Sequence, residues 1–170
     1  MSRSILCRSL ALLACLSSFE IGCRFVDPKT ALEVQDLDGY WVIDTEKSAT
    51  NYIAPSIVFT LKNKTSEPIG DIEATATFKR KGEDSLWGDS FVIIANHSKP
   101  LGPGQTTRVE MRSNADYYTP GAPVEPEIMF KHGLFRDATV DLFVRVGRSG
   151  FVKLAKTEVP RRLKPKEPSP

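Results

Sequence analysis

Apolar and polar residues alternate with a period of two in several short segments of this chain. In residues 56–62 the apolar positions are Ile57, Phe59 and Leu61, and the same alternation returns over residues 72–79. Turn-forming Asn, Ser, Pro and Gly residues lie between the two segments. This pattern predicts two antiparallel strands joined as a central hairpin, each with one buried face. A single pair of strands cannot cover its own apolar face, so further strands must pack on it.

Five further segments have strand character, and turn residues separate them at short intervals. Residues 147–150 read Gly-Arg-Ser-Gly and predict a tight turn that joins the last two segments into a second hairpin. Pro126 at the start and Gly133 just past the end predict a short helix over residues 126–132. The five segments are residues 39–45, 87–95, 105–113, 140–146 and 151–159. We therefore expect an all-β protein, an antiparallel immunoglobulin-like β-sandwich of about seven strands, with a closed barrel as the alternative.

The first residues form a pattern typical of an export signal. Arg3 and Arg8 precede a short apolar run, Leu10–Leu16, and small residues follow before Cys23. We expect a signal peptide over residues 1–22 of the lipoprotein type, with Cys23 as the lipidated residue. Cys15 is a competing site, and cleavage without a lipid or an uncleaved anchor are further alternatives. Acyl chains on Cys23 would hold the protein at a membrane surface.

Composition divides the rest of the chain into three parts. Residues 23–37 show no clear period and are predicted to be a tether, and residues 38–160 are predicted to be the β-sandwich domain. Residues 161–170 are basic and rich in proline, which predicts a disordered tail. All three cysteines lie within the first 23 residues, so the folded part contains no disulfide. The formal net charge of +2 gives no electrostatic reason to expect nucleic-acid binding.

Part of the chain resembles a family of exported domains. The strand at 57–62, the turn NKTSEP at 63–68, the strand ATATFKR at 74–80 and the turn LGPGQ at 101–105 are similar to FxLYD-type domains of bacterial secreted lipoproteins. The resemblance covers residues 56–112. It implies an exported, non-enzymatic β-sandwich, and it transfers no catalytic residues.

The sequence contains no pattern typical of catalysis or metal binding. His97 and His132 are far apart and lack the spacing of a zinc or catalytic site. The acids between residues 36 and 46 lack the spacing of a calcium loop. Gly102–Gly104 is followed by no Lys-Ser/Thr pair, and no G-x-S-x-G is present. We therefore predict that the protein is not an enzyme and holds no cofactor or metal.

Aromatic residues are the remaining candidates for a binding surface. Large amphipathic side chains in loops often take part in recognition, although they also plug the ends of small sandwiches. The candidate contact residues are Tyr52, Tyr117 and Tyr118 in loops, Trp87 at the start of a strand, and Phe143, which lies among the polar residues of its strand. The sequence thus predicts a membrane-tethered lipoprotein on the periplasmic face of the outer membrane, acting as an interaction or assembly module for an envelope protein. The alternative is an accessory domain that binds a glycan.

Overall fold

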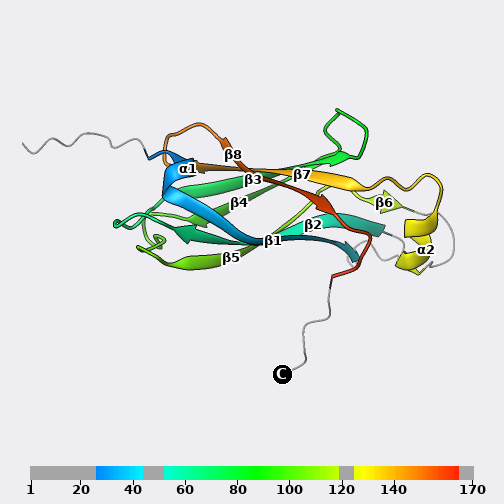
Figure 1. Cartoon of the computed structure of the whole chain (residues 1–170), viewed down its shortest axis with the longest axis horizontal. Helices are drawn as coiled ribbons and strands as arrows, with labels where there is room; N and C mark the ends of the chain where they lie inside the picture. The colour runs from blue at the N-terminus through cyan, green and yellow to red at the C-terminus, as the bar shows by residue number, and fades with distance from the viewer. Residues whose placement is uncertain (1–25, 44–51, 119–124, 165–170) are drawn as a thin grey trace, which may run out of the picture.

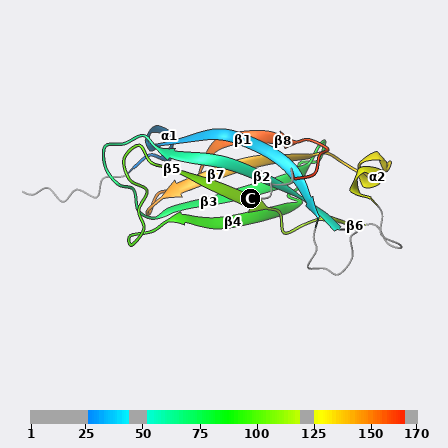
Figure 2. The ribbon, with the colours of Figure 1, turned by 90° about the horizontal axis from the view of Figure 1, so that it is seen from below.

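A computed structural model describes residues 26–43, 52–118 and 125–164, and within these ranges the chain forms two antiparallel sheets packed face to face (Figures 1 and 2). The first sheet contains β1 (Leu32–Ile43), β2 (Tyr52–Asn63), β5 (Thr106–Arg112) and the two-residue β6 (Tyr117–Tyr118). The second sheet has the order β4 (Gly88–Ala95), β3 (Ile72–Arg80), β7 (Ala138–Val146) and β8 (Val152–Val159). Two short helices, α1 (Pro28–Ala31) and α2 (Pro126–Lys131), lie at opposite ends of the long axis (Figure 1).

The core lies between the two sheets and is built from the alternating positions. Every second side chain of β3, from Ile72 to Phe78, is fully buried, and β7 supplies Val140, Leu142 and Val144 from the same sheet. The facing sheet contributes apolar side chains of β2 such as Phe59. The prediction of an all-β, immunoglobulin-like sandwich is therefore confirmed. The predicted hairpin of β7 and β8 and the predicted helix near residue 126 are also present.

The predicted central hairpin is wrong. β2 and β3 belong to different sheets and face each other across the core, where β2 pairs with β1 and β5 and β3 pairs with β4 and β7. Alternation identifies the buried face of a strand, but it does not identify the neighbour to which the strand is hydrogen-bonded. The segment that connects β2 to β3 crosses between the sheets. Buried Asn63 holds this segment against the loop at Leu101, because the Asn63 side-chain nitrogen donates to the Leu101 carbonyl oxygen at 2.9 Å.

The predicted tether over residues 23–37 is too long. Residues 28–37 belong to α1 and to the first half of β1, where Leu32 is buried in the core. A β-bulge between Gln35 and Asp38, with Asp36 at a φ of 51°, breaks the alternation of β1. That irregularity removed the periodic signal, so the strand was predicted to begin several residues late.

The predicted disordered tail is also too long. Residues 160–164, which we call the C-terminal strap, lie against β1. The Trp41 amide nitrogen is 2.8 Å from the Arg162 carbonyl oxygen, and the Lys164 amide nitrogen is 2.8 Å from the Trp41 carbonyl oxygen. Ion pairs join Arg161 to Asp137, Arg162 to Asp38, and Lys164 to Glu110. The prediction placed these cations in a disordered tail, because their partners lie far away along the chain and leave no local signal.

The predicted signal peptide and both candidate lipidation sites lie outside the described residues. Neither α1 nor α2, the helices of the described part, is long and apolar enough to cross a membrane.

Candidate functional site

The end of the sandwich next to α2 is filled by aromatic side chains packed around Trp41. Trp41 is fully buried at the end of β1, and its ring centroid lies 4.9 Å from Phe135 and 6.0 Å from Phe130. Tyr117 from β6 lies 5.8 Å from Trp41, and Trp87 lies 4.8 Å from Tyr117. Centroid separations in this range are typical of favourable aromatic contacts. This α2-end aromatic cluster fixes the short helix and β6 onto the two sheets.

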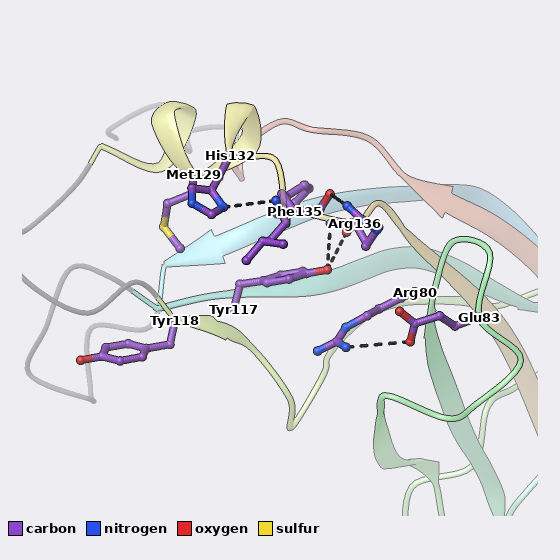
Figure 3. A pocket seen from close by; sticks show the side chains of 9 residues that line it. Arg80, Glu83, Tyr117, Tyr118, Met129, His132, Phe135 and Arg136 are labelled. Atoms are coloured by element: carbon purple, nitrogen blue, oxygen red, sulfur yellow. Dashed lines mark hydrogen bonds and ion pairs between the residues drawn. The ribbon is translucent and has the colours of Figure 1, made fainter.

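A cavity of about 470 Å³ opens beside this cluster (Figure 3). Its walls combine aromatic and apolar groups with charged ones, and the volume falls within the range of small-ligand sites. The lining residues are Arg80, Glu83, Tyr117, Tyr118, Met129, His132, Leu134, Phe135 and Arg136. We call this cavity the α2-end pocket.

Tyr117 is a fixed wall of the α2-end pocket. Its hydroxyl donates a hydrogen bond to the Arg136 carbonyl oxygen at 3.0 Å and accepts one from the Arg136 amide at 2.9 Å. Burial raises the pKa of the Tyr117 phenol, although the Arg136 backbone and the Arg80 charge act in the opposite direction. The phenol therefore remains neutral at physiological pH, and it ties β6 to the segment that follows α2.

Arg80 places a positive charge in the wall of the α2-end pocket. Its guanidinium lies over the Trp87 and Tyr117 rings, 5.1 and 5.5 Å from their centroids, which favours a cation–π contact. The closest carboxylate oxygen, on Glu83, is 3.8 Å away, and the buried Nε has no hydrogen-bond partner among the described residues. Within the described part of the chain, Arg80 therefore makes one long ion pair to Glu83 and leaves its buried Nε without a partner.

The other polar groups of the pocket are also mostly donors or cations. Arg136 donates to the Gly133 carbonyl oxygen at 2.9 Å and is the second guanidinium in the lining. His132 accepts a 3.3 Å hydrogen bond from the Leu134 amide through Nδ1. Glu83 is the one carboxylate among the lining residues. The pocket therefore favours a ligand that brings acceptors or negative charge together with an apolar part.

The structure brings four of the five predicted contact residues to this end of the molecule. Tyr117 and Tyr118 line the pocket, and Tyr52 stacks on Tyr118 with centroids 4.6 Å apart. Trp87 lies behind Tyr117 and does not line the pocket. Phe143 lies elsewhere, half-buried in β7 on the outward face of the second sheet, opposite Thr75 of β3.

Sequence analysis missed the charged side chains of the pocket. Arg80, Glu83 and Arg136 meet only because β3, its following turn and the segment after α2 converge at one end of the sandwich. No spacing along the chain could show that convergence. Trp41 was assigned to a strand but was not recognised as the centre of an aromatic cluster.

No arrangement typical of a catalytic or metal site is present among the described residues. No three His, Cys, Asp or Glu side chains within residues 26–43, 52–118 and 125–164 are placed to bind a metal together. His97 pairs with Asp71 at 2.7 Å in the turn region beside Gly70, whereas His132 lies in the α2-end pocket. The two histidines therefore belong to separate parts of the fold.

Comparisons with known proteins identify no family for this chain. No protein-family model matches the sequence, and no curated protein matches it either. Among solved structures, a solution structure of AT1g01470 from Arabidopsis thaliana is 13% identical and covers 86% of this chain and 92% of that one, with a TM-score of 0.48. A protein from Archaeoglobus fulgidus is 11% identical and covers 78% of this chain and 100% of that one, with a TM-score of 0.44. The resemblance to FxLYD-type domains stays a prediction.

Proposed function

We propose that this chain is an envelope lipoprotein whose non-catalytic β-sandwich binds a protein partner through the α2-end pocket. The observation that supports this proposal most directly is the pocket itself, where Arg80, held only by a 3.8 Å ion pair to Glu83 among the described residues, lies beside exposed apolar side chains. Ile128 is 54% exposed, Leu134 75% and Tyr118 52% at or around this cavity. Exposed apolar groups that surround a cavity with unsatisfied donors are typical of recognition sites.

The position of the pocket also suits a tethered module. α1 begins at Pro28, five residues after Cys23 in the sequence. A fully extended chain of that length reaches about 17 Å, so a lipid on Cys23 would hold the α1 end close to the membrane. Because α2 lies at the other end of the long axis, the α2-end pocket could then face away from the membrane (Figure 1).

A glycan ligand is the second candidate, and one observation favours it. Tyr118 is exposed and stacks on Tyr52, which gives a flat aromatic surface beside the cavity. Sugar hydroxyls, however, need acceptors as well as donors, and the pocket contains one carboxylate against two guanidinium groups. Exposed Leu134 and Ile128 add aliphatic surface that suits a protein better. We therefore place the protein partner first.

The proposal can be tested by site-specific photocrosslinking in intact cells. A photoreactive amino acid at Leu134 should give one discrete crosslinked product, whereas the same group at exposed Lys64, in the turn after β2, should not. The Leu134 product should decrease in an Arg80→Met variant, which keeps the apolar stem over Trp87 but removes the charge. Equal products at both positions, or a product insensitive to Arg80→Met, would contradict binding at this pocket.

The anchor has its own test, and the glycan alternative has another. Mass spectrometry of the N-terminal peptide should find acyl chains on Cys23, and Cys23→Ala should release the protein from membranes.

A thermal-shift screen with envelope glycans should give no stabilisation if the partner is a protein. Stabilisation that is lost in Tyr118→Ala would favour the glycan instead.

A further inference from the structure

β4 is an edge strand whose outer side carries no neighbouring strand in the described part of the chain. It pairs with β3 alone, and Figure 2 shows no element beyond it at that margin of the second sheet. An unpaired edge exposes a row of main-chain donors and acceptors to other chains. In soluble sandwiches such edges are usually protected against pairing by charges, bulges or covering segments.

Only one end of the β4 edge is covered. The Asp89 amide is 3.0 Å from Asn114 Oδ1, and the Asn114 amide is 3.1 Å from the Asp89 carbonyl oxygen, so Asn114 occupies the side of β4 that points away from β3. Main-chain groups of alternate residues point to the same side of an antiparallel strand. Phe91 and Ile93 therefore direct their N–H and C=O groups to this free side, and no other described segment bonds to them.

The side chains of the same residues are exposed and apolar. Phe91 is 56% and Ile93 60% exposed on the outward face, and residues 90–95 (SFVIIA) contain no charge, proline or glycine. In the register of the sheet, Phe91 lies opposite Thr75 of β3, which lies opposite Phe143 of β7. Phe91 and Phe143 thus flank Thr75 on the outward face, and Phe91 lies at the margin of the sheet.

The other sheet edges carry the features that usually block pairing. β8 has Lys153, Lys156 and Glu158 along its length, and β5 has Arg108 and Glu110. β1 is interrupted by the bulge after Gln35. Among β1, β4, β5 and β8, the long strands at the sheet margins of the described part, β4 alone therefore combines free main-chain groups with exposed apolar side chains.

We propose that two copies of this chain associate by antiparallel pairing of their β4 edges. With Val92 on the twofold axis, Phe91 of each copy faces Ile93 of the partner subunit, and each of these pairs exchanges two main-chain hydrogen bonds. Aromatic and β-branched side chains opposite each other stabilise such pairs. The Asn114 contact occupies the free side of β4 at Asp89. The pairing of two copies is therefore limited to the residues of β4 that follow Asp89.

A second copy fits this edge because the contact is self-complementary. The uncharged stretch of one copy faces the same uncharged stretch of the other, so no charge is buried without a partner. The twofold operation also closes the assembly, since the β4 edge of each copy is used once and no third copy can add there. The product is a continuous sheet with four strands from each copy. This dimer does not depend on the lipid anchor or on the α2-end pocket.

The proposal is tested on the purified full-length mature protein by sedimentation equilibrium over a range of concentrations. Wild type should show a monomer–dimer equilibrium, and Ile93→Lys should be monomeric at concentrations where wild type is dimeric. Ile93→Lys should also keep the melting temperature of the wild-type monomer, because residue 93 is exposed. Leu134→Lys, at an exposed apolar position beside the α2-end pocket, is the matched control and should dimerise like wild type.

A cysteine crosslink tests the register directly. The chain has no cysteine after residue 23, so Val92→Cys adds a single thiol to the folded domain. Residues that meet on the axis of an antiparallel pair without mutual hydrogen bonds have Cα atoms about 4.5 Å apart, within disulfide range. Val92→Cys should therefore form a disulfide-linked dimer under mild oxidation, and Leu134→Cys should not. Wild type that is monomeric at all concentrations, dimers that persist in Ile93→Lys, or equal crosslinking of both cysteine variants would overturn the proposal.

Discussion

Replacement of Asn63 by alanine should be among the most destabilising polar substitutions in this protein. Asn63 is fully buried at the end of β2. Its amide nitrogen donates to the Glu67 and Leu101 carbonyl oxygens at 2.8 and 2.9 Å. Its Oδ1 accepts from the amide and hydroxyl of Thr65 at 2.8 and 2.7 Å. These bonds hold the segment that carries the chain from the first sheet to the second.

The expected loss follows from the partners that alanine would leave behind. The Leu101 carbonyl oxygen keeps the Ile69 amide at 2.9 Å, and the Thr65 hydroxyl, whose single proton no longer goes to Asn63 Oδ1, can donate to the Glu67 carbonyl oxygen 2.8 Å away. The full desolvation penalty of unpaired groups is therefore avoided at these two oxygens. With a net contribution of about 0.5–1.5 kcal/mol for each bond, Asn63→Ala should lower the free energy of unfolding by about 2–4 kcal/mol.

Asn96 provides a matched control for this measurement. It starts a second Asn-X-Ser/Thr turn, where its Oδ1 accepts from the Ser98 amide at 3.0 Å and from the Lys99 amide at 2.9 Å, but the residue is exposed. Water can replace those bonds, so Asn96→Ala should cost less than about 1 kcal/mol. Urea unfolding of both variants, with unchanged m-values, gives the comparison. An Asn63→Ala loss no larger than that of Asn96→Ala would refute the role assigned to this buried amide.

Three further predictions concern other parts of the sandwich. A Cβ at Gly88 would overlap Ser113 and lie 2.8 Å from the Ala115 side chain, so Gly88→Ala should lower the free energy of unfolding in urea by about 1–3 kcal/mol. A Cβ at Gly133 meets nothing within 4 Å, so Gly133→Ala should be nearly neutral in the same measurement. Burial alone would raise the pKa of Glu110, but hydrogen bonds from Lys164 and nearby cations outweigh it and hold the pKa below its ordinary value of 4.5. The ionised Glu110 carboxylate therefore stabilises the fold above pH 4.5, and this contribution is lost as the pH falls through the lowered pKa. Lys164→Met should reduce the difference between the free energies of unfolding measured in urea at about pH 7 and about pH 3. Tyr117→Phe should lower the unfolding free energy by about 1–2 kcal/mol, because it removes both hydrogen bonds to the Arg136 backbone, and calorimetry should detect it as a lower melting temperature.

The parts of the fold that sequence predicted well are those in which one regular face is buried. β7 alternates without interruption from Ala138 to Val146, and the structure buries every second residue. β1 was shortened in the prediction because the bulge at Asp36 shifts the buried positions by one. The pairing of β2 and β3 was wrong because alternation reports burial, whereas sheet order depends on contacts between distant segments.

The candidate site was predictable only where its residues were notable by type and did not depend on contacts between distant segments. Tyr117 and Tyr118 were predicted as contact residues because they are aromatic residues in a loop region, and both line the α2-end pocket. Arg80 is the last residue of an ordinary strand, and only the folded chain places its guanidinium over Trp87. Phe143 was predicted to lie among the polar residues of its strand, and the structure places it there, on the outward face of β7.

The route of the C-terminal strap has a practical consequence for anyone who handles this protein. The strap places the Arg161 guanidinium 5.2 Å from the centroid of Phe135, a residue that lines the α2-end pocket. An affinity tag, fluorescent reporter or sensor-chip linkage appended at the carboxyl end would therefore be attached through a segment that contacts a wall of that pocket. Such an attachment could obstruct a ligand and produce a false negative in a screen. A label introduced near α1, at the far end of the molecule, would leave the opening clear (Figure 1).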